Sequence, residues 1–218
     1  MSVLLSAVLA GCQGIDVVSL ETGAVMSPHF VTDYIVAENF DLYRVETDEW
    51  FIFFMNFRGE RISMPGNADK DRFETLAEAF GDVSYNRPVV PDANRALVDP
   101  ISSLNVVCNK DYDAGHEAGS DLCDIVKFWA TTPYGFIHRG YVHEPMDYSD
   151  YWPVMYPQYG YDLIDIPAGE VNSDNSIMLD PWCYLYFTER PAQAGEYEFS
   201  VTITTGGREL SNTATVSF

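Results

Sequence analysis

The chain has 218 residues, of which 47% are hydrophobic, and carries a formal net charge of -21. This apolar content is enough for a folded core, which excludes an intrinsically disordered protein. The acidic excess repels nucleic acid and anionic membrane surfaces, so we expect no DNA or RNA partner. At this length the chain is one large domain or two small ones.

The first twelve residues contain a short apolar run that ends at a cysteine. A membrane-spanning helix needs about 20 apolar residues, so this run is instead typical of a secretory signal peptide. Its ending, Leu9-Ala10-Gly11-Cys12, resembles the lipobox of bacterial lipoproteins, in which the cysteine carries a lipid after cleavage. The resemblance implies a signal peptide over residues 1–11, lipidation of Cys12 and a location in the bacterial cell envelope, at the outer membrane. The alternative is a buried N-terminal strand with a packed cysteine.

Residues 12–28 are expected to form a tether with one weak strand at 15–20, and residues 29–218 a single β-rich domain. The dense apolar run Trp50–Phe57 is too short to span a membrane and is typical of a strand buried on both faces. We expect Arg58-Gly59-Glu60 to turn the chain. Further strands are predicted at 31–36, 42–47, 61–64 and 101–109.

One helix is predicted, over residues 69–80. Its apolar side chains recur at helical spacing and build one stripe, formed by Phe73, Leu76, Ala77 and Phe80. Asn67 or Asp69 can cap the start of this helix, and Gly81 can cap its end.

The last 35 residues are expected to form strands, with a hairpin that turns at Gly206-Gly207. The run Ala194–Phe199 resembles the tyrosine corner of immunoglobulin-like domains. The inter-sheet disulfide of antibody domains is absent, because Phe199 stands where those domains have cysteine. Fold class is therefore predicted as mainly β: an immunoglobulin-like β-sandwich with one short helix, long loops and a C-terminal immunoglobulin-like hairpin over 184–218.

The cysteines leave two alternatives open. If Cys12 carries a lipid, three others remain. Cys108 and Cys123 could close a loop of about 15 residues, for which the chain-entropy model gives about 3 kcal/mol. Alternatively, these two and Cys183 are buried, reduced thiols that behave as small hydrophobic groups.

An acidic loop over residues 109–121 is the candidate metal site. Calcium prefers hard oxygen ligands, and several carboxylates could supply them here: Asp111, Asp113, Glu117 and Asp121. Their spacing is not that of an EF-hand. The alternative is a solvated surface loop, with Ser120 or Asp121 capping a short helix over 122–129.

Aromatic residues crowd the segment 134–161, which three prolines interrupt. Exposed aromatic rings are rigid contact surfaces, and sugars stack on them. We take Tyr151, Trp152 and Tyr156 as the candidate ligand-binding residues. The alternative is a second small core beneath a long loop.

No Gly-x-Ser-x-Gly, His-Glu-x-x-His or phosphate-loop motif occurs in the sequence, so no catalytic residue and no enzyme activity are predicted. The stretch Asp111–Ser120 and the terminal hairpin ending in Phe218 resemble lipid-anchored envelope proteins of Bacteroidetes-type bacteria. That resemblance implies a non-catalytic binding or scaffold module, held to the membrane by the lipid on Cys12, with a glycan or another envelope protein as partner. Two alternatives remain: a glycan-binding surface lipoprotein that uses 134–161, and a hydrolase that uses paired carboxylates.

Overall fold

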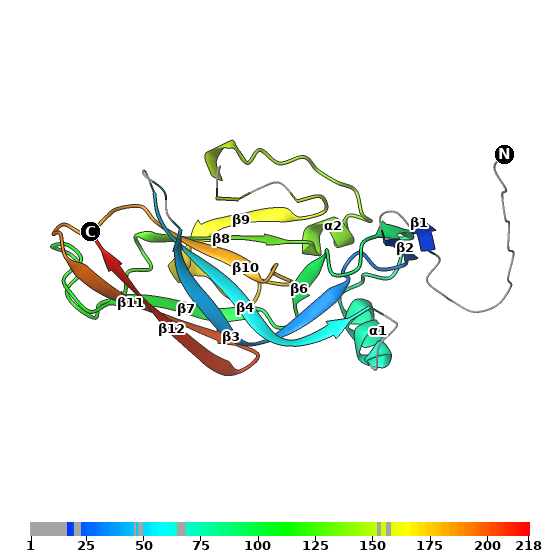
Figure 1. Ribbon diagram of the computed structural model, residues 1–218, viewed down its shortest axis with the longest axis horizontal. Helices are drawn as coiled ribbons and strands as arrows, with labels where there is room; N and C mark the ends of the chain where they lie inside the picture. Colours follow the sequence, from blue (N-terminus) through cyan, green and yellow to red (C-terminus); the bar gives the residue numbers. More distant parts are fainter. Residues whose placement is uncertain are drawn as a thin grey trace, which may run out of the picture.

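The computed structural model describes residues 17–19, 23–45, 47, 50–64, 69–151, 154–155 and 158–218. The elements run in the order β1 (Val17–Ser19), β2 (Ala24–Ser27), β3 (Asp33–Val45), β4 (Phe51–Ser63), α1 (Lys70–Ala79), β5 (Arg87–Val89), β6 (Arg95–Leu97), β7 (Ile101–Cys108), β8 (Val126–Thr132), α2 (Tyr134–His138), β9 (Asp162–Pro167), β10 (Trp182–Phe187), β11 (Glu196–Thr205) and β12 (Arg208–Ser217). Short 3-10 turns occupy Ser149–Tyr151 and Ala168–Glu170. The molecule is elongated, with β1, β2 and α1 at one end and the C-terminus at the other (Figure 1).

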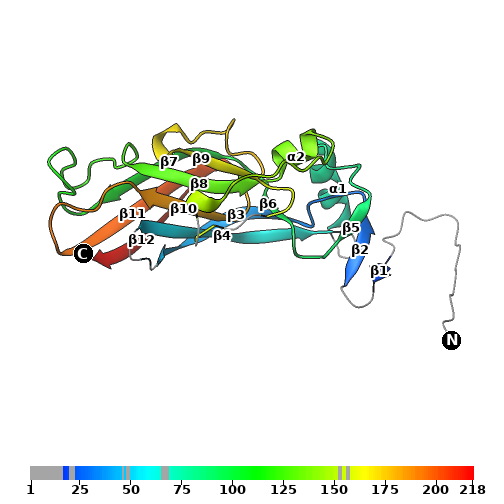
Figure 2. The same ribbon diagram turned by 90° about the horizontal axis from the view of Figure 1, so that it is seen from above.

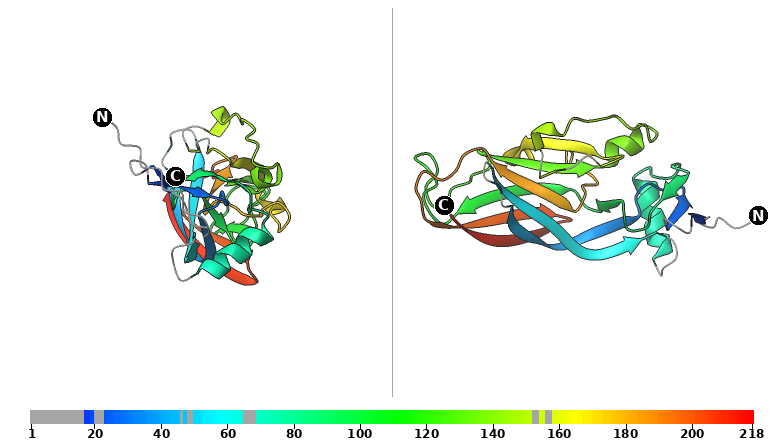
Figure 3. Two further views of the ribbon diagram at one scale, coloured as in Figure 1. Left: turned by 90° about the vertical axis from the view of Figure 1, so that its right-hand side faces the viewer. Right: turned by 45° about the horizontal axis from the view of Figure 1, so that its top comes forward.

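Two sheets make a β-sandwich, so the predicted mainly-β fold is confirmed. Among the described residues, the larger sheet has the strand order β6-β3-β4-β10-β8-β9 and the smaller has the order β12-β11-β7. Figure 3 shows the hairpin of β11 and β12 on one side of the molecule and β8 and β9 on the other. A third small sheet, β1-β2-β5, lies at the N-terminal end (Figure 2).

Aromatic side chains fill the space between the two main sheets. Phe51 of β4 and Phe187 of β10 have ring centroids 4.3 Å apart, and Phe53 of β4 lies 5.3 Å from Phe199 of β11. Each of these four side chains is at most 2% exposed. Ile52, between the two β4 phenylalanines, is also fully buried, but in a separate cluster on the outer face of the sheet. The prediction that this run is buried on both faces is therefore confirmed for residues 51–53.

The predicted turn at 58–60 is wrong, because β4 continues straight through it. Gly59 pairs with Ala37, next to a bulge that β3 forms between Ala37 and Asn39. A Cβ atom on Gly59 would clash with the carbonyl oxygen of Val36. The glycine therefore permits a close approach of two strands rather than a reversal of the chain. As a result, the strands expected at 50–57 and 61–64 form one long strand.

The predicted helix is confirmed as α1, which buries Phe73 and Ala77 against the N-terminal half of the molecule. Asp69 occupies the N-cap position without a side-chain cap hydrogen bond. Asn67, the other proposed cap, lies outside the described residues. Gly81 follows the helix with a φ of 74°, the left-handed conformation expected of a C-terminal cap.

The alternative helix over 122–129 is wrong, because the second half of this segment belongs to β8 and the first half is not helical. β8 pairs with β10 on one edge and with β9 on the other. Pairing on both edges buries the strand and outweighs the local capping signal. A five-residue helix that was not predicted, α2, follows directly and buries Phe136 and Ile137.

The C-terminal hairpin is confirmed. Gly206 and Gly207 have φ values of 56° and 71°, as a type I′ turn between two strands requires. The hydroxyl of Tyr197 donates to the carbonyl of Gln193 at 3.0 Å, which is the contact that defines a tyrosine corner. The side chains that face the core alternate along β11, and all are at most 2% exposed: Tyr197, Phe199, Val201 and Ile203.

Cys108, Cys123 and Cys183 are free and buried, which agrees with the thiol alternative. The proposed lipidation site, Cys12, lies outside the described residues. β1 and β2 fall within the segment expected as a tether, and β2 pairs with β5 of the domain. Among the described residues, no helix is long and apolar enough to cross a membrane.

Replacing Phe199 by alanine should lower the free energy of unfolding by about 3 to 5 kcal/mol, since it leaves a cavity between the sheets. Ser200 points to the opposite face of β11 and is only partly buried, so Ser200→Ala should change stability by about 0.5 kcal/mol or less. A denaturant titration of both variants measures the contrast. A larger loss for Ser200→Ala than for Phe199→Ala would contradict the described packing.

Candidate ligand-binding site

A surface hollow of about 660 Å³ lies toward the N-terminal end of the molecule. It is bounded by β5, the loop from β5 to β6, the segment before β9 and the start of β10. The lining residues are Phe30, Tyr85, Pro88, Val89, Val90, Asp92, Ala93, Asn94, Arg95, Gln158, Tyr159, Tyr161, Asp180 and Trp182. We call this the larger hollow, because a smaller one of about 320 Å³ adjoins it.

Arg95 and Trp182 form one wall of the larger hollow. The Arg95 guanidinium carbon lies 4.5 Å from the centroid of the Trp182 ring, which is a cation-π contact. The indole N–H donates to the side-chain oxygen of Asn56 at 3.1 Å, and this fixes the orientation of the ring. Trp182 is 41% exposed although it belongs to a strand of the larger sheet. Arg95 forms no ion pair within the described part of the chain, so its N–H groups are available to a ligand.

Asp180 places a buried carboxyl group in the same hollow. Its side chain is 3% exposed, and one carboxylate oxygen accepts the backbone N–H of Trp182 at 2.9 Å. Burial raises the pKa of Asp180 to about 6, while the Trp182 N–H and the charge of Arg95 oppose the shift. Burial is costly for a carboxylate, and carboxyl groups with a raised pKa are frequent at functional sites.

Tyrosine rings form another part of the lining. Tyr159 is 53% exposed, and its hydroxyl accepts a hydrogen bond of 3.2 Å from Arg87. The Arg87 guanidinium carbon lies 5.4 Å from the ring centroid of Tyr85. Tyr161 is buried, and its hydroxyl donates to the carbonyl of Arg95 at 2.9 Å. The hollow therefore combines exposed aromatic surface with a guanidinium and a carboxyl group.

Asp92 is the second carboxylate that lines the larger hollow, and its surroundings differ from those of Asp180. It is 70% exposed and forms an ion pair with Arg61, which also binds the buried Asp33 at 2.6 Å. The charge of Asp92 is thus compensated and solvated. The hollow has one desolvated and one solvated carboxyl group.

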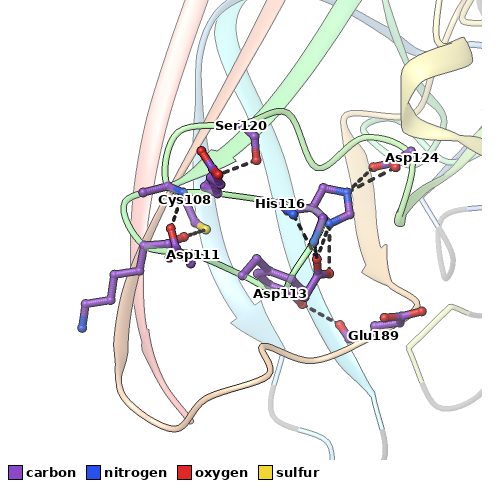
Figure 4. Close-up of polar contacts among 12 residues, drawn as sticks. Cys108, Asp111, Asp113, His116, Ser120, Asp124 and Glu189 are labelled. Atoms are coloured by element: carbon purple, nitrogen blue, oxygen red, sulfur yellow. Dashed lines mark hydrogen bonds and ion pairs between the residues drawn. The ribbon is translucent and has the colours of Figure 1, made fainter.

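The acidic loop, shown in Figure 4, uses its carboxylates for internal hydrogen bonds. Asp113 accepts the backbone N–H groups of Gly115 and His116 at 2.7 and 3.0 Å. The His116 ring bridges Asp113 and Asp124, at 2.9 and 3.0 Å, and the bond to Asp113 raises the pKa of His116. The Asp111 carboxylate accepts the backbone N–H of Ala118, and the Asp121 carboxylate accepts the backbone N–H of Cys123.

These contacts hold turns of the loop rather than directing its oxygens to one point. In the part of the chain that the structure describes, no group of three or more histidine, cysteine, aspartate or glutamate residues is placed to hold a metal ion. Glu117 contributes only its backbone carbonyl, which accepts a bond from Ser120. Calcium at this loop stays a prediction.

The described part of the aromatic segment 134–161 is mostly packed. Tyr151 is partly buried, lies 4.9 Å from the ring of Trp129, and donates its hydroxyl to Asp165 at 2.9 Å. Tyr148 is 7% exposed in the same cluster. Trp152 and Tyr156, the other two candidate residues, lie outside the described residues. Among the described aromatics of this segment, the structure brings Tyr159 and Tyr161 into the larger hollow.

Sequence reasoning missed Arg95, Asp180 and Trp182. No motif connects them, because they come from segments about 85 positions apart. The one local signal is that Trp182 follows Asp180-Pro181, two positions before the strand predicted to begin at Tyr184.

No protein-family model matches this chain, and comparisons with curated proteins and with solved structures found no match.

Replacing Asp180 by asparagine should change how stability depends on pH. Because the pKa of Asp180 is raised, the folded state binds the carboxyl proton more tightly than the unfolded state does. The bound proton therefore stabilises the folded state at low pH, and this stabilisation is lost as pH rises from about 4 through about 6. Asparagine does not titrate and keeps an oxygen for the Trp182 N–H. The free energy of unfolding of Asp180→Asn, relative to that of the wild type, should therefore rise by on the order of 3 kcal/mol between pH 4 and pH 7.

Denaturant titrations at both pH values measure this difference, with Asp174→Asn, an exposed carboxyl group, as the matched control. A stability difference between wild type and Asp180→Asn that is the same at pH 4 and pH 7 would contradict the prediction.

Proposed function

We propose that this protein is a lipid-anchored binding module of the bacterial cell envelope, and that its ligand binds in the larger hollow. The observation that carries the proposal is the pairing of Arg95, stacked on the exposed Trp182, with the buried carboxyl group of Asp180 in one hollow. Small-molecule sites are typically concave, about 300–1,000 Å³ in volume, and combine apolar walls with a few oriented polar groups. The larger hollow, at about 660 Å³, has these properties.

The proposed anchor lies close to this hollow along the chain. β2 begins at Ala24 and pairs with β5, whose residues Pro88 and Val89 line the hollow. Ala24 is twelve positions after Cys12, and an extended chain of that length spans at most about 40 Å. A lipid on Cys12 would therefore keep the binding site near the membrane surface.

A glycan is the ligand class that the larger hollow favours. Two exposed rings, those of Trp182 and Tyr159, lie beside hydrogen-bonding groups, and sugar rings present an apolar face together with polar edges. A hydrolase remains the second candidate, supported by the desolvated Asp180 beside the solvated Asp92. Release of shorter products from a bound glycan, lost in Asp180→Asn, would favour the hydrolase.

Membrane attachment should depend on Cys12. Stable anchoring needs more than one acyl chain, and the lipobox cysteine carries these chains. We expect Cys12→Ser to leave the protein unprocessed or to release it from membranes when the full chain is expressed in a host that processes lipoproteins. Fractionation and intact mass measure this. Membrane association at an unchanged mass in the variant would contradict the anchor.

Ligand binding should depend on the wall of the larger hollow. We expect a glycan array probed with the purified full chain to give signals that fall at least tenfold in Trp182→Ala and in Arg95→Gln. Tyr43→Ala is the matched control, because Tyr43 is an exposed aromatic residue of β3 that does not line the hollow. Signals that survive both hollow variants would place binding elsewhere and reject the proposal.

A further inference from the structure

A second, smaller hollow adjoins the first. Its volume is about 320 Å³, and its lining residues are His143, Glu144, Pro145, Met146, Tyr148, Gln158, Tyr159 and Tyr161. Three of these residues, Gln158, Tyr159 and Tyr161, also line the larger hollow. Because Tyr161 is buried, Gln158 is partly buried and Tyr159 is 53% exposed, the Tyr159 ring is the most exposed part of this shared wall.

The Tyr159 ring is held from two sides. The imidazole of His143 lies 4.8 Å from it at an interplanar angle of 33°, and the ring of Phe136 lies 5.6 Å away, edge to face. Arg87 donates to its hydroxyl. A half-exposed ring with this many contacts is a fixed partition between the two hollows rather than a freely rotating side chain.

The smaller hollow contains an unused polar group. Tyr148 is 7% exposed, and its hydroxyl is buried without a hydrogen-bond partner within the described part of the chain. Buried hydroxyl groups are almost always hydrogen-bonded, to protein, water or a ligand. The larger hollow has a comparable group in Asp180, whose carboxyl is 3% exposed and lines that hollow. Each hollow thus has a buried polar side chain in its lining.

We propose that the two hollows are two subsites of one groove, which binds a neutral linear oligosaccharide with sugar rings on both sides of Tyr159. This inference rests on the proposed function and adds the length and charge class of the ligand. A chain is required because a single ring would occupy only one of the two hollows. The ring of Tyr159 lies where two successive sugars would meet.

The charges of the site favour a neutral sugar. Arg95 supplies N–H donors and Asp180 supplies a carboxyl group in the same hollow, and sugar hydroxyls can both donate and accept. An anionic polysaccharide would meet a protein with a formal net charge of -21. A peptide would pair its backbone with a strand edge, and among the described residues β5 and β6 lie at sheet edges beside the larger hollow. Aromatic rings and side-chain polar groups nevertheless line most of the groove, which favours a sugar.

Calorimetric titration of the full chain with neutral oligosaccharides of one to six units tests the inference. The probes are the gluco-, manno- and xylo-oligosaccharide series with β-1,4 linkages, and the malto-oligosaccharides. We expect affinity to rise at least tenfold from one unit to the length that crosses Tyr159, and then to level off. Tyr159→Ala should abolish this gain with chain length.

Tyr148→Phe tests the contribution of the smaller hollow alone, because it removes only the Tyr148 hydroxyl and keeps the ring. We expect it to weaken binding of the chain about two- to tenfold, the effect of one hydrogen bond, and to leave binding of the single sugar unchanged. Tyr43→Ala is the control, because Tyr43 is 51% exposed, closely matched to Tyr159 at 53%, and lines neither hollow. The control should bind as the wild type does.

Each contrary result has a distinct meaning. If a single sugar binds as tightly as a chain and binding is lost in Trp182→Ala, the groove is wrong and the proposed function stands. If none of these sugars binds but a peptide library does, and Trp182→Ala loses the peptide, the ligand class is wrong and the site stands. If binding of every probe is unchanged in Trp182→Ala, both the inference and the proposed function are wrong.

Discussion

The buried carboxylate of Asp82 holds the N-terminal half of the molecule together. It is fully buried and accepts the backbone N–H groups of Phe30 and Val31, both at 2.8 Å, and the hydroxyl of Tyr141 at 2.9 Å. Burial raises the pKa of Asp82, and these donors oppose the shift. Removing a partner from a buried charge costs several kcal/mol, so the three donors must stay in place. One side chain therefore joins the start of β3, the end of α1 and the segment after α2.

Asp82 is itself positioned by the helix that precedes it. The N–H groups of Gly81 and Asp82 donate to the carbonyls of Glu78 and Ala77, which is the Schellman arrangement at a helix end. Phe30, which Asp82 holds, packs its ring against those of several residues and lines the larger hollow. The geometry of the proposed binding site is thus set by a helix cap and one buried carboxylate that do not themselves line the hollow.

Several groups that line the larger hollow are oriented by contacts within the protein itself. Trp182 is oriented by Asn56, Arg95 lies against the Trp182 ring, and the backbone of Arg95 is bonded to Tyr161. Side chains that are already ordered lose little entropy on binding. This arrangement favours recognition of a rigid ligand such as a sugar ring. The Asp113–His116–Asp124 bridge at the opposite end orders a loop in a comparable way, but its groups satisfy one another.

Local sequence patterns determined much of the fold. The alternation along β11, the Gly206-Gly207 turn and the apolar stripe of α1 each depend on residues a few positions apart, and each is present in the structure. The turn at Gly59 failed because a glycine permits either a reversal or a close strand approach, and only the facing strand β3 decides which one occurs.

The proposed binding site could not be predicted in this way. Arg95 and Trp182 come from β6 and β10, which β3 and β4 separate in the sheet, and their long side chains meet only in the tertiary structure. Asp180 acquires its raised pKa only from burial in that packing. The aromatic segment 134–161 showed the same limit, since its composition allowed either a core or a surface, and Tyr148 and Tyr159 differ only in what packs on them. Secondary structure follows from short-range periodicity, whereas exposure, pKa and convergence of side chains depend on contacts between distant segments, which one sequence does not specify.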